Sequence, residues 1–210
     1  MPLTLFGSRG SGSAAVEMAL RAAKIEYRVE RASEWEPDSA LAELRRVNPL
    51  GQIPTLVLED GTVLTESAAI LIYLGLEHPG HALLPKNSTE RAGVLRGLVF
   101  IAANCYPAVS ISDYPERWTT SETKAARERV RAAARAQLHR NWEIFFEQFA
   151  PELERTKGSP GALAFLAVVV SRWSGTRKHL LANVGRTSKL LTVLEQHPRI
   201  AGVLHEHSAA

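Results

Sequence analysis

Two neighbouring stretches of sequence decide the fold: NPLGQIPTL at residues 48–56 and DGTVLTESAAI at residues 60–70. The Asp-Gly pair in the second stretch is a strong signal for a tight turn between strands, so residues 54–58 and 62–64 are predicted to form a β-hairpin. Apolar residues then recur at three- and four-residue spacing over residues 66–76, which indicates a helix. This part of the chain is therefore predicted to be strand, strand, helix.

The preceding part of the chain has a strand–helix–strand pattern. Residues 3–6 are a short apolar run that suits a buried strand, and residues 26–30 alternate with a period of two, which suits a half-buried strand. Between them, a turn rich in serine and glycine leads into good helix formers over residues 14–23. Strands joined by a crossover helix tend to be parallel. With a short helix over residues 39–47, the order βαβ and then ββα is that of a thioredoxin-like domain.

The C-terminal part is predicted to be entirely helical. Helical patterns cover five segments: residues 90–103, 121–150, 161–173, 187–196 and 199–205. A stretch rich in Pro, Gly and Asn, without periodicity, marks a linker before them. The predicted fold class is therefore α/β plus all-α, with a thioredoxin-like domain over residues 1–80, a linker over 81–88 and a helical bundle domain over 89–210.

The composition is that of an ordinary globular protein, because 45% of the 210 residues are hydrophobic, 22% are charged and the net charge is only +3. The densest basic cluster, residues 127–131, is interleaved with acidic and apolar residues, which suits a solvated helix face better than a nucleic-acid site. The longest apolar run, residues 162–170, is about half of the ~20 residues that a membrane span needs. The first residues lack a secretory-signal pattern. A cytoplasmic protein with no nucleic-acid or membrane partner is therefore expected.

The single cysteine, Cys105, excludes an internal disulfide and a multi-cysteine metal site. It is expected to be a small buried hydrophobe and not a nucleophile. No spacing among the seven histidines suggests a metal site, so no bound metal is expected.

Taken together, residues 48–74 resemble the glutathione-binding half of the cytosolic glutathione-transferase family, in a bacterial-like form. The match covers the order and spacing of several unlike residues, which composition or periodicity alone would not produce. The resemblance implies an enzyme that stabilises the thiolate of glutathione, its co-substrate, and directs it at an electrophilic small molecule, as in detoxification. It also implies a homodimer that uses no metal or redox cofactor. It assigns neither the class nor the electrophile.

The same resemblance implies where glutathione binds. Ile53-Pro54 looks like the family's cis-proline, which turns the backbone N–H and C=O of Ile53 toward an extended peptide ligand; a proline tolerated at the first residue of a strand is the alternative. Ser67 would bind the ligand's α-carboxylate at a helix N-terminus, and Glu66 its α-ammonium group. The same region also suits an ordinary helix cap with Thr65 as the N-cap.

Three further residues are candidates for the glycine end of the ligand. Gln52 would contact it as a neutral amide, or it is an exposed loop residue. Trp35 and Arg45 could reach the same carboxylate, and nothing in their spacing decides this.

The group that activates the thiol is expected in the first strand–helix turn, where a hydroxyl and the N-terminus of a helix would both favour a thiolate. Ser11 is the first choice; Ser13, which also suits the helix N-cap, is second and Ser8 is third. The backbone amides of this glycine-rich turn are the alternative. Family classes that use Ser or Cys would place that residue at Gly10 or Gly12 of this sequence, and the turn contains neither Tyr nor Cys.

Two predictions concern the helical part. Tyr106 is a possible residue of the second-substrate site, because its phenol could donate to a leaving group or an oxyanion; packing of aromatic residues around a helix kink is the alternative. The central helix is expected to be capped by Ser159 with Pro160 at its first position. The acid that completes the family's capping box is replaced by Ala162.

Two other functions remain open on the same scaffold. A glutathione-dependent thiol reductase or peroxidase is disfavoured because the turn lacks cysteine. A non-catalytic protein, acting in protein interaction or as a ligand carrier, would not need the ligand-directed pairs Glu66-Ser67 and Ile53-Pro54.

Overall fold

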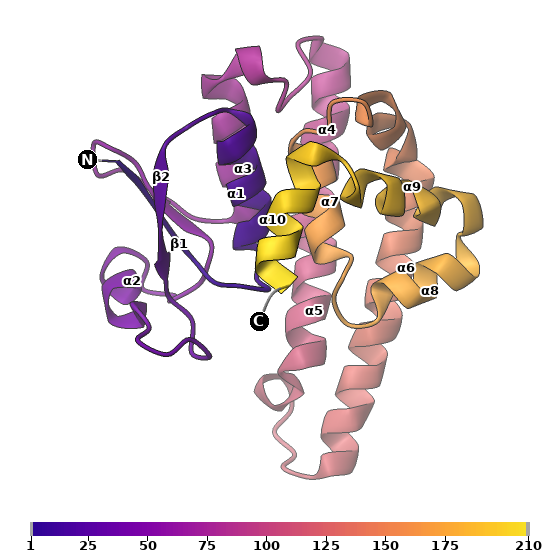
Figure 1. Cartoon of the computed structure of the whole chain (residues 1–210). Coiled ribbons are helices and arrows are strands. Elements are labelled where there is room, and N and C mark those ends of the chain that lie inside the picture. Colours follow the sequence, from indigo (N-terminus) through magenta and orange to yellow (C-terminus); the bar gives the residue numbers. More distant parts are fainter. Residues whose placement is uncertain (1, 209–210) are drawn as a thin grey trace.

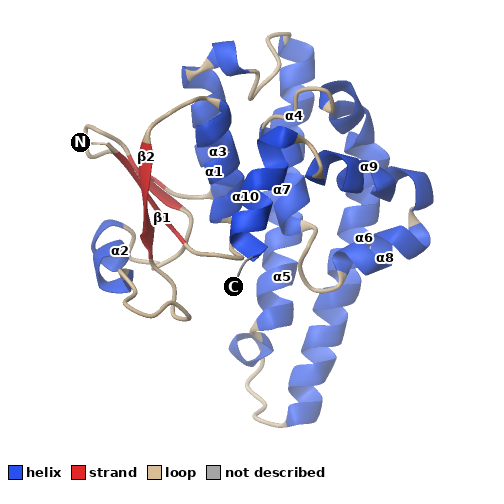
Figure 2. Ribbon diagram, in the orientation of Figure 1, coloured by secondary structure: helices blue, strands red, loops and turns tan. Residues whose placement is uncertain are grey.

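The computed structural model describes residues 2–208, without the side chains of residues 186–188. A small sheet with its helices forms one side of the molecule, and a larger group of helices lies beside it (Figure 1). Within the described chain every strand belongs to the first part and only helices follow (Figure 2), which confirms the predicted fold class. The domain boundaries around residues 80–88 stay a prediction, and residues 209–210 of the second predicted domain lie outside the described residues.

The sheet has four strands in the order β2-β1-β3-β4. Their bounds are β1 (Leu3–Gly7), β2 (Tyr27–Arg31), β3 (Thr55–Val57) and β4 (Val63–Leu64). As predicted, β1 and β2 are parallel and are connected through α1 (Ser13–Ala22), whereas β3 pairs antiparallel with both β1 and β4. The predicted hairpin turn is also present: Gly61 has a φ of +87°, and the Asp60 carboxylate accepts a hydrogen bond from the Thr62 N–H at 2.8 Å.

Side chains of β1 alternate between two apolar layers. Leu5 is fully buried in the main core, together with α1 and α3 (Ser67–Glu77). Phe6 belongs to a smaller cluster with Leu44 of α2 (Leu41–Val47). The sheet is therefore covered by α1 and α3 on one face and by α2 on the other (Figure 1).

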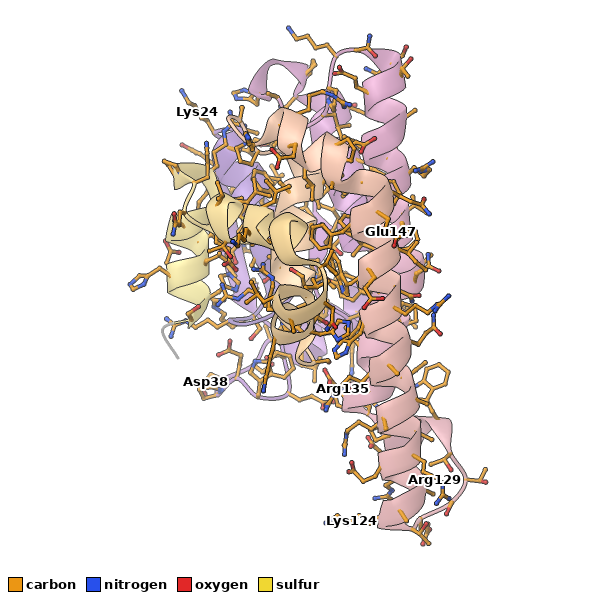
Figure 3. The ribbon with its side chains drawn as sticks, turned by 90° about the vertical axis from the view of Figure 1, so that its right-hand side faces the viewer. Lys24, Asp38, Lys124, Arg129, Arg135 and Glu147 are labelled. Carbon is orange, nitrogen blue, oxygen red and sulfur yellow. The ribbon has the colours of Figure 1, made fainter. Side chains whose placement is uncertain are left out.

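The helical part contains elements of very different length. They are the 3₁₀ turn Pro79–His81, α4 (Ser88–Phe100), the π-helical segment Ile101–Cys105, α5 (Tyr106–Asp113), the 3₁₀ turn Pro115–Trp118, α6 (Lys124–Thr156), α7 (Ala162–Val170), α8 (Thr176–Asn183), α9 (Gly185–Glu195) and α10 (Pro198–Ser208). The first turns of α6 extend beyond the rest of the molecule, where Figure 3 labels Lys124 and Arg129. The sequence pattern identified most of these helices but missed α5 and α8.

Helix α7 is buried along its whole length, and all nine of its residues are apolar. It packs against α1 and α3 of the first part and against α4, α6 and α9 of the second. One continuous hydrophobic core therefore joins the two parts of the chain, with α7 inside it.

The beginning of α7 is satisfied by a distant piece of backbone. Gly161 is the N-cap and makes no side-chain capping bond, and the Ala162 N–H donates to the carbonyl of Leu83 at 2.9 Å. A Cβ on Gly161 would lie 2.5 Å from that carbonyl oxygen and 2.8 Å from the carbonyl oxygen of Ala82. The predicted cap by Ser159 is therefore wrong, because a backbone carbonyl replaces the serine hydroxyl and approaches only where the side chain is absent.

The last helix is tied to the first by polar contacts. The buried side chains of Glu17 in α1 and His207 in α10 meet at 2.9 Å. Arg21 donates to both carboxylate oxygens of Glu206, at 2.7 and 2.5 Å, and this interaction lowers the pKa of Glu206. These contacts hold α10 against α1.

The continuous helical stretch Ser88–Asp113 contains an 18-residue window with a mean hydropathy of 1.5 and is long and apolar enough to cross a membrane. A single such helix is weak evidence, because core helices of globular proteins share these properties. This stretch packs against α6 and α7, which accounts for part of its apolar composition.

Gly161→Ala is expected to lower the free energy of unfolding by about 3 kcal/mol, because the added Cβ must separate α7 from residues 82–83. Urea denaturation followed by circular dichroism measures the change. Gly158→Ala is the matched control, since a Cβ there meets nothing within 4 Å, and its effect should stay within about 0.5 kcal/mol. Equal effects of the two substitutions would contradict the close approach of Leu83.

Candidate functional site

The first strand–helix turn is held in shape by its own serine side chains. Ser11 Oγ donates to the Ser8 carbonyl at 2.8 Å and lies 3.0 Å from Ser13 Oγ. Ser13 Oγ donates to the same carbonyl at 3.2 Å and accepts from the Ser8 N–H at 3.3 Å. Ser8 Oγ accepts from Ser33 at 2.8 Å and donates to Glu36, which lowers the pKa of the Glu36 carboxyl. All three serines predicted as thiol-activating groups are therefore buried and hydrogen-bonded within and beside this turn.

Two glycines complete the turn. Gly10 has a φ of +71°, a conformation that favours glycine. Gly12 is the N-cap of α1 and provides no side-chain cap, and its N–H makes no hydrogen bond within residues 2–208. The turn therefore presents a free N–H group at the positive end of the helix dipole. Ser13, the alternative N-cap, is instead the first residue of α1.

The loop from Asn48 to Thr55 is held in place by one buried amide. Asn48 Nδ2 donates to the Gln52 carbonyl at 3.1 Å and to Thr55 Oγ1 at 2.9 Å, while its Oδ1 accepts from the Leu50 N–H at 3.2 Å. Thr55 Oγ1 in turn donates to the Gln52 carbonyl at 2.8 Å. These bonds fix the path of the backbone immediately before β3.

Within this loop the Ile53-Pro54 peptide bond is cis. The N–H and C=O of Ile53 make no hydrogen bond in the described part of the chain. They are therefore free to pair with an extended ligand, as the edge of a sheet would. Gln52 is exposed, and its contact with the ligand stays a prediction.

Helix α3 begins without a side-chain cap. Its N-cap is Glu66, with φ 62° and ψ 110°, a conformation that side-chain-bearing residues rarely adopt and that often marks functional sites. The alternative with Thr65 as the N-cap is therefore wrong. Because no side chain in residues 2–208 caps this end, the first N–H groups of α3 remain available around the buried Ser67.

Gly12, Pro54 and Ser67 come together around the phenol of Tyr106. A Cβ on Gly12 would lie 2.4 Å from Tyr106 Oη and 3.6 Å from Pro54 Cδ. Burial raises the pKa of Tyr106 to about 12; the neighbouring Ser67 hydroxyl opposes this rise and the charge of Glu66 adds to it. Tyr106, predicted from its place in the helical part, thus reaches the serine–glycine turn, the cis-proline loop and the start of α3 at once.

The other candidate residues have different surroundings, and Arg45 lies beside the loop of the site, since a Cβ on Gly51 would be 3.3 Å from its side chain. Cys105 is fully buried, and burial raises the pKa of its thiol to about 12, so it packs as a hydrophobe, as predicted. Arg45 lies in α2 with its guanidinium 4.0 Å from the Glu34 carboxylate, and Trp35 is largely exposed.

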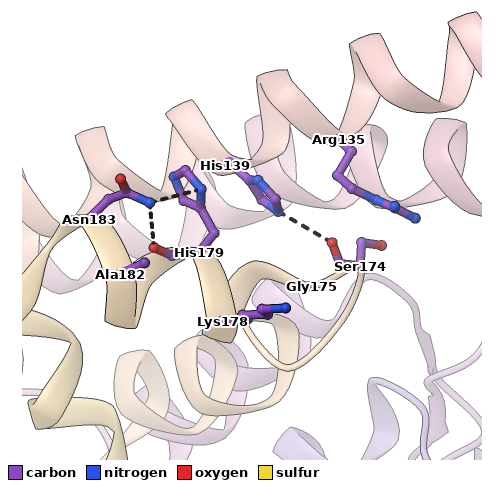
Figure 4. A pocket seen from close by; sticks show the side chains of 8 residues that line it. All are labelled: Arg135, His139, Ser174, Gly175, Lys178, His179, Ala182 and Asn183. Carbon is purple, nitrogen blue, oxygen red and sulfur yellow. Dashed lines mark hydrogen bonds between the residues drawn. The ribbon is translucent and has the colours of Figure 1, made fainter.

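A surface pocket of about 500 Å³ lies between α6 and α8, away from the residues that the sequence singled out (Figure 4). Its walls carry Arg135, Lys178 and two stacked imidazoles, His139 and His179, whose ring centroids are 4.2 Å apart. Burial lowers the pKa of His139. Within residues 2–208, no group of three or more His, Cys, Asp or Glu side chains could hold a metal ion.

Two contributions to the site were not predicted from the sequence. The first is the hydrogen bonding of Asn48, although an Asn whose side chain bonds the backbone two residues later is a recognisable signal for a turn. No local signal links Gly12 to Tyr106, because their contact exists only between distant segments.

Comparisons with known proteins agree with this geometry. Residues 13–77 match the sequence profile of the glutathione S-transferase N-terminal domain. The whole structure is similar to that of a glutathione transferase homologue from Sulfitobacter with bound glutathione, with a TM-score of 0.78, 21% identity and 98% of each chain covered. This chain therefore carries a glutathione S-transferase N-terminal domain within a glutathione-transferase fold.

Curated relatives match part of the chain. It is 36% identical over 129 residues to the uncharacterized GST-like protein YncG of Escherichia coli (strain K12), covering 61% of this chain and 62% of that protein. It is 34% identical over 99 residues to a probable maleylacetoacetate isomerase of Caenorhabditis elegans, covering 47% of this chain and 45% of that one. The chain thus spans less than two thirds of the length of these curated relatives.

Asn48→Ala is expected to lower the free energy of unfolding by about 1–3 kcal/mol, because it leaves the buried groups that Asn48 satisfies without partners. Urea denaturation measures this loss. Leu50→Ala, in the same loop but at a side chain that is 71% exposed, is the control and should change stability by less than about 0.5 kcal/mol. If both variants unfold at the wild-type urea concentration, the amide does not hold the loop.

Proposed function

We propose that this protein is a glutathione transferase that joins the thiolate of glutathione to an electrophilic carbon of a small molecule. The observation that carries the proposal is the convergence of three sets of free backbone groups on one place. They are the N–H and C=O of Ile53, the uncapped start of α3 at Ser67 and the free N–H of Gly12 at the start of α1. Unpaired polar groups that a fold leaves together in this way suit a peptide ligand.

The ligand's two ends have different partners in this proposal. The α-carboxylate of the γ-glutamyl group accepts from the first N–H groups of α3 and from the Ser67 hydroxyl, where the helix dipole favours negative charge. The exposed Glu66 carboxylate accepts from the α-ammonium group in a charge-assisted bond. The cysteinyl backbone pairs with Ile53, and Gln52 is placed toward the glycine end. With the γ-glutamyl end of the ligand at α3 and its glycine end at Gln52, the thiol of the cysteinyl part faces the start of α1.

The start of α1 favours the thiolate over the thiol. Its dipole and the free Gly12 N–H stabilise negative charge on the sulfur. Ser11 adds a hydroxyl donor when its proton turns from the Ser8 carbonyl to the sulfur, and Ser13 Oγ still satisfies that carbonyl. The thiolate then forms a sulfur–carbon bond, and a leaving group departs with its electron pair or the carbon skeleton takes up a proton. No electrons are gained or lost overall, so the reaction requires no redox cofactor.

A second candidate activity is isomerisation. It is favoured by the relative named as a probable maleylacetoacetate isomerase. Reversible addition of the same thiolate to an activated double bond permits rotation about it, so the same site would serve. A thiol reductase is less favoured because the only cysteine, Cys105, is fully buried.

The protein is further proposed to be a cytoplasmic homodimer. Large apolar side chains are exposed on α3 and α4, two helices that contact each other. Leu76 of α3 is 55% exposed and Val99 of α4 is 54% exposed. Exposed apolar surface of this kind is commonly covered by a partner subunit.

Ser67→Ala is expected to weaken glutathione binding about tenfold, because it removes one hydrogen bond to a charged carboxylate. Isothermal titration calorimetry measures the dissociation constant. Ser88→Ala is the matched control, since Ser88 is likewise the first residue of a helix, and it should bind glutathione like the wild type. A folded wild-type protein that fails to bind glutathione would rule out the proposed function.

Ser11→Ala is expected to raise the pKa of the bound glutathione thiol by about one unit, because a thiolate loses one hydroxyl donor. The ultraviolet absorbance of the thiolate, followed against pH in the complex, reports that pKa. An unchanged titration would transfer the role to Ser13, Ser8 or the backbone amides.

A further inference from the structure

The hydroxyl of Tyr106 is one of several buried polar atoms that make no hydrogen bond of normal geometry among residues 2–208, although the Ser67 hydroxyl lies near enough to lower its pKa. A buried hydroxyl in this state carries a desolvation cost that no partner offsets. Such a group in a native fold needs an explanation, and one explanation is a ligand that the free protein lacks.

The position of this hydroxyl indicates which ligand atom would satisfy it. Tyr106 Oη lies against Gly12 at the start of α1, next to Pro54 of the cis-proline loop. The Ser67 hydroxyl is near enough to lower the pKa of the phenol, and the charge of Glu66 raises it. These are the residues between which the cysteinyl part of glutathione lies in the proposed function, so the thiol is the group of the ligand that comes nearest to the phenol.

The ring is held firmly in this direction by the helical part of the protein. Tyr106 makes an edge contact with Trp173, with ring centroids 5.7 Å apart. It follows a π-helical segment, an irregularity that is frequent at functional sites. Asn141 Nδ2 donates to the Asn104 carbonyl of that segment at 2.7 Å, and Pro107 fixes the following backbone angle. The phenol therefore has little freedom to turn toward another partner.

Space for the phenol exists only because residue 12 is glycine. A side chain there would overlap the hydroxyl, with its Cβ 2.4 Å from Oη. The same position cannot therefore hold a serine or cysteine for thiol activation in this arrangement. A donor from the helical part thus occupies the space that a side chain on the turn would need.

We propose that Tyr106, reaching across from the helical part, donates its phenolic hydrogen bond to the sulfur of bound glutathione and stabilises the thiolate. This inference rests on the proposed function, and it adds a second hydroxyl donor to Ser11. The thiol proton leaves to solvent, the sulfur keeps its electron pair, and the phenol keeps its own proton throughout. The raised pKa of Tyr106, about 12, means that the phenol remains a donor at neutral pH. Tyr106 is thereby a catalytic residue that contacts the reacting atom.

The test is the Tyr106→Phe variant, which removes only the hydroxyl. The pKa of the bound glutathione thiol, followed by thiolate absorbance against pH, is expected to rise by about one unit or more. At a pH above both values, the affinity for glutathione should fall about tenfold. The affinity for S-methylglutathione, which has no thiol to ionise, should be unchanged. The ligand-free variant should unfold at the same temperature as the wild type or at a higher one, because an unsatisfied buried group is gone.

Tyr114→Phe is the control, since Tyr114 lies just beyond α5, is 40% exposed and has no place in this site. It should leave the thiol titration unchanged. A Tyr106→Phe enzyme that binds glutathione and ionises it like the wild type would overturn the inference while leaving the proposed function intact. A lowered unfolding temperature with an unchanged thiol pKa would also overturn it, because the hydroxyl would then be structural. Failure of the wild type to bind glutathione would overturn both.

Discussion

The structure depends on hydrogen-bond partners for the backbone N–H groups at the start of the buried helix α7. A helix that is apolar on every side must lie inside the core, and its first N–H groups then need partners that water cannot supply. The Leu83 carbonyl provides one, and Arg199 holds the same region together by donating to the carbonyls of His81 and Pro160, both at 3.2 Å. These bonds join the connecting segment, the start of α7 and α10. The two parts of the chain consequently share one core and hold a fixed orientation, which a site assembled from both parts requires.

In the candidate site, side chains and backbone groups have different roles. Side chains such as Asn48 and the serines of the first turn hydrogen-bond within their own loops and fix the backbone. The backbone then presents its unpaired groups to a ligand, at Ile53 and at the starts of α1 and α3. Because backbone donors are rigid, they lose little entropy when they bind. The Tyr106 hydroxyl, carried by the other part of the chain, is a further group of the site that makes no hydrogen bond of normal geometry among residues 2–208.

Most of the fold could be predicted because its signals are local. The Asp-Gly turn, the alternation in β2 and the helical spacing of α3 each depend on a few adjacent residues, and each element formed as expected. Besides the missed helices α5 and α8, the expectations that failed concerned helix ends. Thr65 and Ser159 are good capping residues by type, but Glu66 and Gly161 became the N-caps. At α7 the reason is clear: a tertiary partner, the Leu83 carbonyl, replaced the local cap.

By itself, the sequence determined the order of elements, the thioredoxin-like topology and the segment that resembles a glutathione-binding motif. Those features come from turn chemistry, periodicity and residue type within short windows. Only the tertiary structure decided that the serine hydroxyls face inward to the Ser8 carbonyl and to Glu36, and that Tyr106 fills the space over Gly12. The physical reason is that hydrogen-bond partners and steric space are properties of neighbours in the fold, and these neighbours come from segments far apart in the chain. The sequence shows only that residue 12 is a glycine, whereas the fold shows that the Tyr106 hydroxyl occupies the space beside it.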